Sequence, residues 1–535
     1  MPLHHTSMST HPTRRAVLGA AIAAAGTGVL AACSDASGSP GTDHGPMNHG
    51  SSTEATPAGY VAPDGPEVAA AEAKRGSGPV RSVRLTATAT PLDLGGGRTV
   101  TSWAYGDRLP GQEVRVTAGD TLALSLANNL PQSTSVHWHG LAMRNDMDGV
   151  PGLTQSPVKA GASFDYRFTV PDPGTYWFHP HSGVQQDRGL YAPLIVEDPK
   201  EPLKYDREWV VILDDWVDGI DGSTPDGVLA ELSGGMADHA GHAAASPTGT
   251  VNGPSRVLMG ATSPLLGGDA GDVAYPYYLV NGRTAEAPSV FDAKPGDRIR
   301  LRIINAGGDT AFRVALGGHQ LTVTHTDGFP VQHARADALL LGMGERYDVL
   351  VTAGDGVFPL TAVAEGKEAK DRKAAAMALL RTGGGTAPTA SVRPKELAGK
   401  LLTADRLKAA ESVALPARKP DRTIELRLTG NMEQYNWAFD SVPYTPDQRH
   451  PVRAGERVRL VFSNNTKMWH PIHLHGHSFA LGADAGGARK DTASLLPRGR
   501  LTVDFDADNP GLWMVHCHNV YHSEAGMMTV LGYQK

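Results

Sequence analysis

The chain has 535 residues, with 49 Lys and Arg against 56 Asp and Glu, which gives a formal net charge of -7. The length exceeds one ordinary domain and predicts about two to four. This mild charge, without a basic patch, argues against a nucleic-acid partner. The 62 Gly and 38 Pro favour turns over long helices, and the 2 Cys are too few for a disulfide framework.

The N-terminus resembles an export signal. Arg14 and Arg15 precede an Ala- and Gly-rich apolar run that ends at LAAC, as in a twin-arginine signal with a lipoprotein-type cleavage box. We therefore predict a signal over residues 1–33, export to the cell envelope, and a lipid anchor at Cys33 on the outer face of the membrane. The alternative is an uncleaved transmembrane helix, for which a run of about 17 residues is near the lower limit.

Residues 34–75 are rich in Ser, Gly, Thr, Pro and Ala and show neither strand nor helix periodicity. This composition predicts a flexible linker. Within it, the HGPMNH segment (residues 44–49) has side chains able to hold copper loosely, although a solvated linker is the simpler interpretation.

Two patterns recur three times in the rest of the chain. A Gly, an acidic residue, alternating apolar residues and a final Asn have the same spacing in residues 119–128, 296–305 and 455–464. This alternation is typical of a half-buried strand that follows a turn. The stretches PGTYWFHPH, DGVFPLTAV and PGLWMVHCH form a second repeat in the same order.

These repeats predict three consecutive β-sandwich domains in an all-β fold. We expect the first domain over residues 76–200, the second over 201–385 and the third over 395–535. The last linker is expected in the Gly- and Pro-rich stretch of residues 381–394.

The first and third repeats carry histidines where the second does not. Steps of nine and eleven residues from Asn128, or from Asn464, reach an HxH pair, whereas the same steps from Asn305 reach apolar residues. In the second repeat, the stretches of the first and third domains likewise end in an HxH pair, and that of the middle domain does not. Four matched His-x-His pairs result: His137/His139, His179/His181, His473/His475 and His516/His518.

The spacing of these pairs predicts a metal cluster. Residues two apart on a strand point to the same face, roughly 6–7 Å apart, which suits two imidazoles that reach different metals. Eight histidines can enclose about three metals. We predict one cluster shared by the first and third domains, with the middle domain as a spacer without ligands. Ordinary core or surface histidines would not explain four matched pairs.

Cys517 lies between two of these histidines and therefore faces the other side of its strand. His470, His522 and Met527 lie at spacings that can bring them beside it. Two His, one Cys and a distant Met are the ligand set of a blue, type 1 copper. From Cys517, electrons would pass through a few covalent bonds to the cluster.

The motifs HWHG, HPH, HPIHLHG and HCHxxxHxxxGM occur in this order. From about residue 76 to its end the chain resembles the three-domain multicopper oxidases, the laccase and cuprous oxidase family, and most closely their exported copper-resistance members from actinobacteria. The resemblance implies cupredoxin-like Greek-key domains and four copper ions per chain. It assigns type 1 copper to His470, Cys517, His522 and Met527, type 2 to His137 and His473, and the type 3 pair to His139, His179, His181, His475, His516 and His518.

The resemblance also implies the reaction. Substrate gives up electrons singly at type 1 copper, and four of them reduce O2 to water at the cluster. We expect the protein to oxidise Cu(I) in copper detoxification, with phenols and aromatic amines as further substrates. We also expect it to be a monomer. The alternatives are a laccase with an organic natural substrate and, from another class, a copper-storage lipoprotein without turnover. Copper nitrite reductase and a zinc hydrolase account for fewer of these residues.

Two acidic residues receive candidate roles through the resemblance. Asp148 matches a residue that assists proton delivery near the cluster, although an acidic residue in a polar loop is often only a turn former. Many bacterial relatives have Glu directly after the second type 1 histidine, but here Ser523 stands there and Glu524 follows. Glu524 is therefore a second candidate proton donor.

Several methionines are candidate contacts for a Cu(I) substrate. Met468 matches a position close to type 1 copper in related cuprous oxidases, but Thr466 replaces the acidic residue that accompanies it there. Soft Cu(I) favours thioether and imidazole ligands. A polar segment of the second domain contains Met236, His239, His242 and Met259. These residues either gather Cu(I) or belong to a surface insertion without that role.

Overall fold

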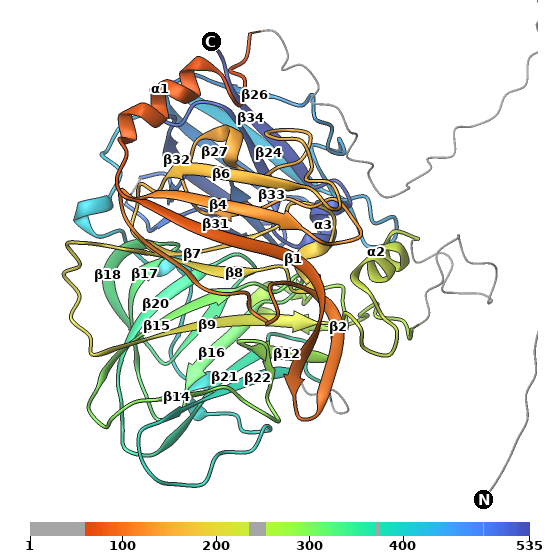
Figure 1. The fold of residues 1–535 in the computed structure, drawn as a ribbon, viewed down its shortest axis with the longest axis vertical. Coiled ribbons are helices and arrows are strands. Elements are labelled where there is room, and N and C mark those ends of the chain that lie inside the picture. The colour runs from red at the N-terminus through yellow and green to blue at the C-terminus, as the bar shows by residue number, and fades with distance from the viewer. Residues whose placement is uncertain (1–58, 235–252, 370–373, 485) are drawn as a thin grey trace, which may run out of the picture. The chain divides into compact units, whose positions relative to one another are not determined.

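The computed structural model describes residues 59–234, 253–369, 374–484 and 486–535. Strands predominate there, each of three successive regions of the chain contributes two large sheets, and the middle region adds a two-stranded one (Figure 1). The predicted export signal, Cys33 and residues 44–49 lie outside the described residues, as do Met236, His239 and His242. Among the described helices, none combines the length and apolar character needed to cross a membrane.

The first domain has sheets of order β2-β1-β4-β6 and β3-β8-β7-β5. Its strands are β1 (Val80–Gly95), β2 (Arg98–Tyr105), β3 (Val114–Thr117), β4 (Thr121–Asn128), β5 (His137–His139), β6 (Ser163–Thr169), β7 (Gly174–His179) and β8 (Ala192–Glu197). Two short 3-10 helices, η1 (Asn145–Met147) and η2 (Gln185–Arg188), lie in its loops.

Helix α1 (Pro66–Arg75) occupies the end of the predicted linker. Pro66 is at its first turn, with Glu67 nearby, and basic residues close the last turn, as helix ends prefer. Val68 is buried, and Glu72 accepts a hydrogen bond from the Thr169 backbone N–H at 2.6 Å. The linker prediction is therefore wrong for residues 66–75, because a helix this short depends on tertiary contacts that composition does not show.

The middle domain has sheets of order β13-β12-β9-β15-β20-β17-β18 and β14-β22-β21-β16-β19-β23, and β10 pairs with β11 in a third, two-stranded sheet. Its elements are β9 (Arg207–Trp216), α2 (Pro225–Ser233), β10 (Thr262–Ser263), η4 (Pro264–Leu266), β11 (Gly268–Asp269), β12 (Tyr277–Val280), β13 (Arg283–Thr284), β14 (Val290–Asp292), β15 (Arg298–Asn305), β16 (Phe312–Leu316), β17 (Leu321–Thr326), β18 (Phe329–Ala336), β19 (Ala338–Leu341), β20 (Arg346–Thr352), β21 (Val357–Ala364), β22 (Ala375–Arg381) and β23 (Leu401–Leu402). Strand β23 pairs with β19. The middle sheet thus continues past residue 395, where we predicted the third domain to begin.

The third domain has sheets of order β25-β24-β27-β32-β29-β30 and β26-β34-β33-β28-β31. Its strands are β24 (Arg422–Thr429), β25 (Ala438–Phe439), β26 (His450–Val452), β27 (Arg457–Asn464), β28 (His470–Leu474), β29 (Phe479–Leu481), β30 (Arg489–Lys490), β31 (Thr492–Leu495), β32 (Arg500–Asp506), β33 (Leu512–Cys517) and β34 (Met528–Tyr533). Helix α3 (Val520–Glu524) joins β33 to β34, and η5 (Lys395–Ala398), η6 (Ala404–Arg406) and η7 (Glu411–Val413) precede β24.

The first sequence repeat corresponds to strands β4, β15 and β27, each of 8 residues and each ending at the Asn. This Asn has one role in all three domains. Its side-chain amide donates to two or three backbone carbonyls, one of them always in the loop that follows the Asn, and its Oδ1 accepts the backbone N–H two residues on. A buried amide satisfied in this way holds the loop that leads to the next strand. In the first domain that next strand, β5, contains an HxH pair; in the third, β28 contains His473 and is directly followed by His475.

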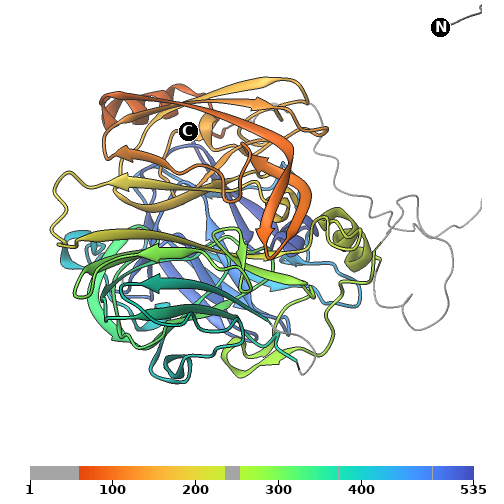
Figure 2. The ribbon, with the colours of Figure 1, turned by 60° about the horizontal axis from the view of Figure 1, so that its bottom comes forward.

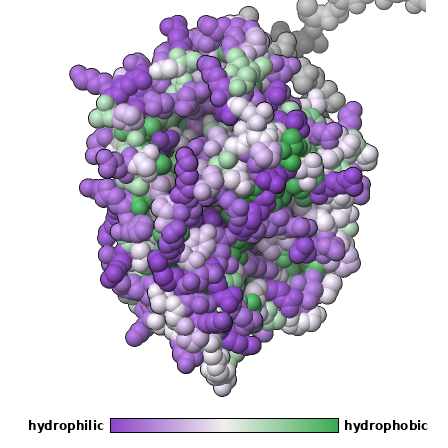
Figure 3. Space-filling model, turned by 60° about the vertical axis from the view of Figure 1, so that its left-hand side comes forward, coloured by the Kyte–Doolittle hydropathy of each residue, from purple (hydrophilic) through white to green (hydrophobic). Residues whose placement is uncertain are grey.

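The three domains pack against one another. In Figures 1 and 2 the green strands of the middle domain lie beside the orange strands of the first and the blue strands of the third. Strand β7 contacts β15 and β20, and β18 contacts β30. The face shown in Figure 3 is mainly hydrophilic, with hydrophobic side chains in small groups, so the large apolar residues are concentrated inside and between domains.

Candidate metal centre

The structure brings all eight histidines of the four pairs together. Strand β5 pairs with β7 so that His137 is opposite His179, and β28 pairs with β33 so that His473 is opposite His516. Across the domain boundary the rings of His137 and His475 stack with centroids 3.8 Å apart. Those of His139 and His473 stack at 3.9 Å. None of the eight side chains is more than 8% exposed.

Most of these rings are held in the neutral form that a metal ligand requires. Burial is the main cause, and each ring also disfavours a proton on its neighbours. Together these effects push the pKa well below its ordinary value at His139, His179, His475, His516 and His518, and lower it at His473.

Several of the buried ring nitrogens converge without a hydrogen-bond partner among the described residues. His516 donates from Nδ1 to the Cys517 carbonyl at 2.8 Å, and His475 from Nδ1 to Asp148 at 2.9 Å. Their Nε2 atoms therefore carry lone pairs, yet they face each other at 3.1 Å. The Nε2 atoms of His137, His179 and His473 are buried and lack a hydrogen-bond partner. Such an arrangement is repulsive alone and fits metal ions placed among the nitrogens.

Two carboxylates orient the rings in a reciprocal way. Asp148 accepts from His137 through its backbone carbonyl at 2.9 Å and from His475 through its side chain at 2.9 Å. Asp491 of the third domain is its counterpart. Its carbonyl accepts from His473 of its own domain at 2.9 Å, and its carboxylate accepts from His139 of the first domain at 3.1 Å. Outer partners of this kind set the tautomer and direction of a ligand.

Sequence reasoning found Asp148 but missed Asp491, which has no distinctive local motif. The two carboxylates also differ electrostatically. Burial alone would raise the pKa of Asp491, but the Arg346 guanidinium and the hydrogen bond from His139 hold it well below its usual range. Among the described residues no Lys or Arg pairs with Asp148. Its Oδ1 lies 3.2 Å from His137 Nδ1 but accepts no hydrogen bond, because that nitrogen donates to the Asp148 carbonyl.

A second, smaller site lies on the other face of β33. The Cys517 Sγ is 3.6 Å from His470 Nδ1 and 3.7 Å from His522 Nδ1, and the two nitrogens are 3.1 Å apart. All three side chains are fully buried. Met527, also fully buried, is tied to this trio because its carbonyl accepts from the Cys517 N–H and its own N–H donates to the His522 carbonyl. Two imidazoles and a thiolate at these distances suit one copper ion.

Both imidazoles of this site have outer partners that sequence reasoning did not assign. His470 Nε2 lies 2.9 Å from the Thr466 hydroxyl, and His522 Nε2 lies 2.9 Å from Asp272 of the middle domain. Burial opposes protonation of His522, but the Asp272 carboxylate outweighs it and raises the pKa of His522 to about 10.

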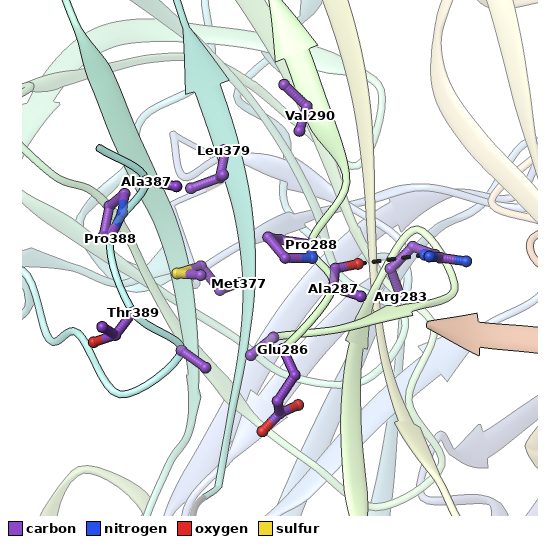
Figure 4. Close-up of a pocket in the computed structure, with 12 residues that line it drawn as sticks. Arg283, Glu286, Ala287, Pro288, Val290, Met377, Leu379, Ala387, Pro388 and Thr389 are labelled. Atoms are coloured by element: carbon purple, nitrogen blue, oxygen red, sulfur yellow. Dashed lines mark hydrogen bonds between the residues drawn. The ribbon is translucent and has the colours of Figure 1, made fainter. Parts of the chain in front are cut away.

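The other predicted residues lie outside these two centres. Glu524 is the last residue of α3 and is half-buried. Met468 is only 2% exposed and packs in the core, whereas Met259 is 58% exposed. The open pocket in Figure 4, lined by Arg283, Glu286, Met377 and neighbours on the middle domain, contains none of the predicted site residues.

The middle domain forms one wall of the histidine cluster although it supplies no histidine to it. Gly344, between β19 and β20, has φ +83°, and a Cβ built on it would lie 2.9 Å from His139 Cε1 and 2.9 Å from His518 Cδ2. Our description of this domain as a spacer is therefore incomplete, because its backbone limits where two rings can go.

Replacing Gly344 with Ala is accordingly expected to disturb the cluster. The left-handed φ adds about 1–2 kcal/mol of backbone strain, and the new methyl pushes the His139 and His518 rings apart. We expect lower copper retention at the cluster while the Cys517 site still gives its blue colour. Gly296→Ala is the control, since it has φ +86° but nothing within 4 Å of the added Cβ. Equal effects of the two changes would contradict the proposed contact.

Three family models described as multicopper oxidase match residues 86–201, 207–385 and 417–535. The chain belongs to the multicopper oxidases. It is therefore a copper-containing oxidoreductase that uses oxygen, and its all-β fold is that of three cupredoxin-like domains.

Individual relatives agree with this family. Multicopper oxidase MmcO of Mycobacterium tuberculosis is 49% identical over 87% of this multicopper oxidase and 90% of its own length. A copper resistance protein A homolog of Pseudomonas syringae pv. tomato is 30% identical, covering 81% and 89%. Among solved structures, the laccase from Botrytis aclada has a TM-score of 0.66 at 25% identity, covering 85% and 88%.

Proposed function

We propose that this multicopper oxidase oxidises Cu(I) to Cu(II) and holds four copper ions. The observation that carries the proposal is the set of buried imidazole nitrogens without partners, joined through Cys517 to a separate two-histidine, one-cysteine site. In this proposal His470, Cys517, His522 and Met527 hold type 1 copper, and His137 and His473 hold type 2. His139, His179, His181, His475, His516 and His518 would hold the type 3 pair, and three of them, His181, His475 and His516, have ring nitrogens close enough together to share one ion.

Bound copper would supply one-electron transfer at the first site and O2 reduction at the cluster. The chain's own part is to connect and protect them. Cys517 links the sites, since its carbonyl accepts a hydrogen bond from His516, its neighbour in the chain. Asp148 has a carboxylate oxygen without a hydrogen bond beside the cluster and is the group placed to hold a proton there. Burial of every ring excludes bulk water.

Cu(I) is favoured over a bulky organic reductant by the surroundings of the type 1 residues. His470 and His522 are fully buried, and their outer nitrogens are already engaged by Thr466 and Asp272. The Trp437 ring lies 4.4 Å from that of His522. A phenol thus finds no open imidazole edge. The names of copper-resistance relatives support the same substrate, whereas the laccase names keep an organic one as the second candidate.

Met468, which the resemblance placed near type 1 copper, has no direct part in binding the substrate in this proposal. Its burial in the core argues against direct capture of Cu(I) from solvent. We retain export, with anchoring at Cys33, as a proposal that a mass measurement on the membrane-bound protein would test.

Oxygen uptake by the copper-loaded mature protein, measured with Cu(I) and with a simple phenol, tests the function. We expect rapid uptake with Cu(I), four Cu(I) consumed per O2 because water formation takes four electrons, and no peroxide. Fast phenol turnover with slow Cu(I) turnover would make the protein a laccase. No uptake with either reductant at full copper loading would refute the oxidase and favour storage.

A further inference from the structure

We infer that Arg346 of the middle domain is a positioning residue for the copper cluster, acting through Asp491 on His139 and His473. This inference rests on the proposed function. Within the described part of the chain no hydrogen bond or ion pair joins Arg346 to a histidine of the cluster, and Arg346 lies on β20 of the domain that supplies no histidine to it.

The contact between Arg346 and Asp491 is a buried, two-point ion pair. Nη1 donates to Asp491 Oδ1 at 2.7 Å and Nη2 donates to Oδ2 at 2.6 Å, and both side chains are fully buried. A planar guanidinium paired in this way fixes the plane of the carboxylate as well as its charge. Asp491 therefore has one available orientation.

Arg346 is itself fixed from two directions. Its Nε donates to the Thr175 carbonyl of the first domain at 3.1 Å, and Nη1 donates to the Gly344 carbonyl at 3.0 Å. Its guanidinium carbon lies 5.7 Å from the centre of the Tyr176 ring. One side chain of the middle domain thus contacts the first domain and, through Asp491, the third.

Asp491 passes this constraint to the cluster. Its Oδ1 accepts from His139 Nε2 at 3.1 Å and from the Thr492 hydroxyl at 2.8 Å. The bond to His139 directs the other nitrogen of that ring, Nδ1, to within 3.2 Å of His518 Nε2. The Asp491 carbonyl holds His473 Nδ1, which leaves His473 Nε2 facing the interior of the cluster.

The reciprocal residue Asp148 provides an internal comparison. It orients His137 through its backbone carbonyl and His475 through its carboxylate, the same two kinds of acceptor that Asp491 uses, but without a cationic partner among the described residues. The cluster therefore has one carboxylate clamped by an arginine and one that is not. Clamping suits a residue that must keep two ligands in place. The unclamped partner is left for proton transfer.

Without Arg346 the buried Asp491 would be an uncompensated charge, and it would have to move or lose its charge. Either change releases His139 and His473. Loss of an outer partner of a metal ligand typically lowers affinity or activity about 10–100-fold.

The test compares Arg346→Lys and Arg346→Met with wild type after copper loading. Arg300→Lys is the matched control, since Arg300 is 2% exposed and pairs with Asp348 of the same domain in a similar buried pair. The readouts are copper content, the blue absorption, and the type 1 and type 2 electron paramagnetic resonance signals. Oxygen uptake is recorded alongside them.

We expect Arg346→Met to keep the blue colour and the type 1 signal but to alter the type 2 signal and lower copper retention at the cluster about 10–100-fold. Arg346→Lys should retain more copper than Arg346→Met and alter the type 2 signal less, because lysine keeps the positive charge but lacks the two-point geometry. Arg300→Lys should leave both signals unchanged.

An unchanged type 2 signal in Arg346→Lys, and in Arg346→Met where that variant folds, would overturn the inference. An equal change in Arg300→Lys would also overturn it, because the effect would then be general loss of packing. If the loaded wild type has no type 2 signal and consumes no oxygen, the proposed function fails instead, and the two failures are distinguishable.

Discussion

Replacing Cys517 with Ser is expected to abolish oxygen uptake with every reductant while most copper at the cluster stays bound. Serine keeps the size of the side chain but offers no thiolate to pair with His470 and His522. The electron-transfer path through Cys517 to His516 then lacks the copper ion from which it would start. We expect a fall of at least about 10³-fold, equal to about 4 kcal/mol in the barrier. The blue absorption should disappear together with the activity.

Copper analysis and spectroscopy on the same preparation check this result. Met514→Leu is the control, because Met514 is buried on the same strand and the swap nearly conserves volume; colour and uptake should persist. Substantial substrate-driven uptake by the Cys517→Ser variant would contradict electron transfer through this residue. A storage protein would retain most of its copper in the variant and would show no uptake even as wild type.

Replacing Asp148 with Asn is expected to slow oxygen reduction by about 10²–10⁴-fold, the usual contribution of a positioned proton-transfer group. The amide oxygen can still accept the hydrogen bond from His475, so the ring keeps its partner. An amide cannot carry the proton, however. Reduction of the type 1 site by substrate should be unaffected, because Asp148 contacts His137 and His475 rather than Cys517.

Two separate measurements distinguish these steps. Without oxygen, substrate should bleach the blue colour of the variant at the wild-type rate; after oxygen is added, the colour should return slowly. Asp146→Asn serves as the control, because Asp146 lies in the same loop but pairs with Arg144 at the surface side of it. Reoxidation of Asp148→Asn at the wild-type rate would remove Asp148 from proton delivery.

The eight histidines and the Cys517 site were predictable because their signals are local and repeated. Strand alternation places residues two apart on one face, and the Gly-to-Asn repeat marks equivalent strands in each domain, so counting from Asn128 and Asn464 found histidines that converge in the structure. The same count from Asn305 found apolar residues, which are buried as Val314 and Leu316.

The hydrogen-bond partners of these side chains could not be predicted in the same way. Arg346 and Asp491 are 145 residues apart, His522 and Asp272 are 250 apart, and His139 and Asp491 are 352 apart. No local period links such pairs. The sequence by itself determined the three-domain β architecture and which side chains converge, because both follow from strand periodicity. Only the tertiary structure decided which charges orient those side chains and that the middle domain helps to do so, because these contacts form where three domains meet.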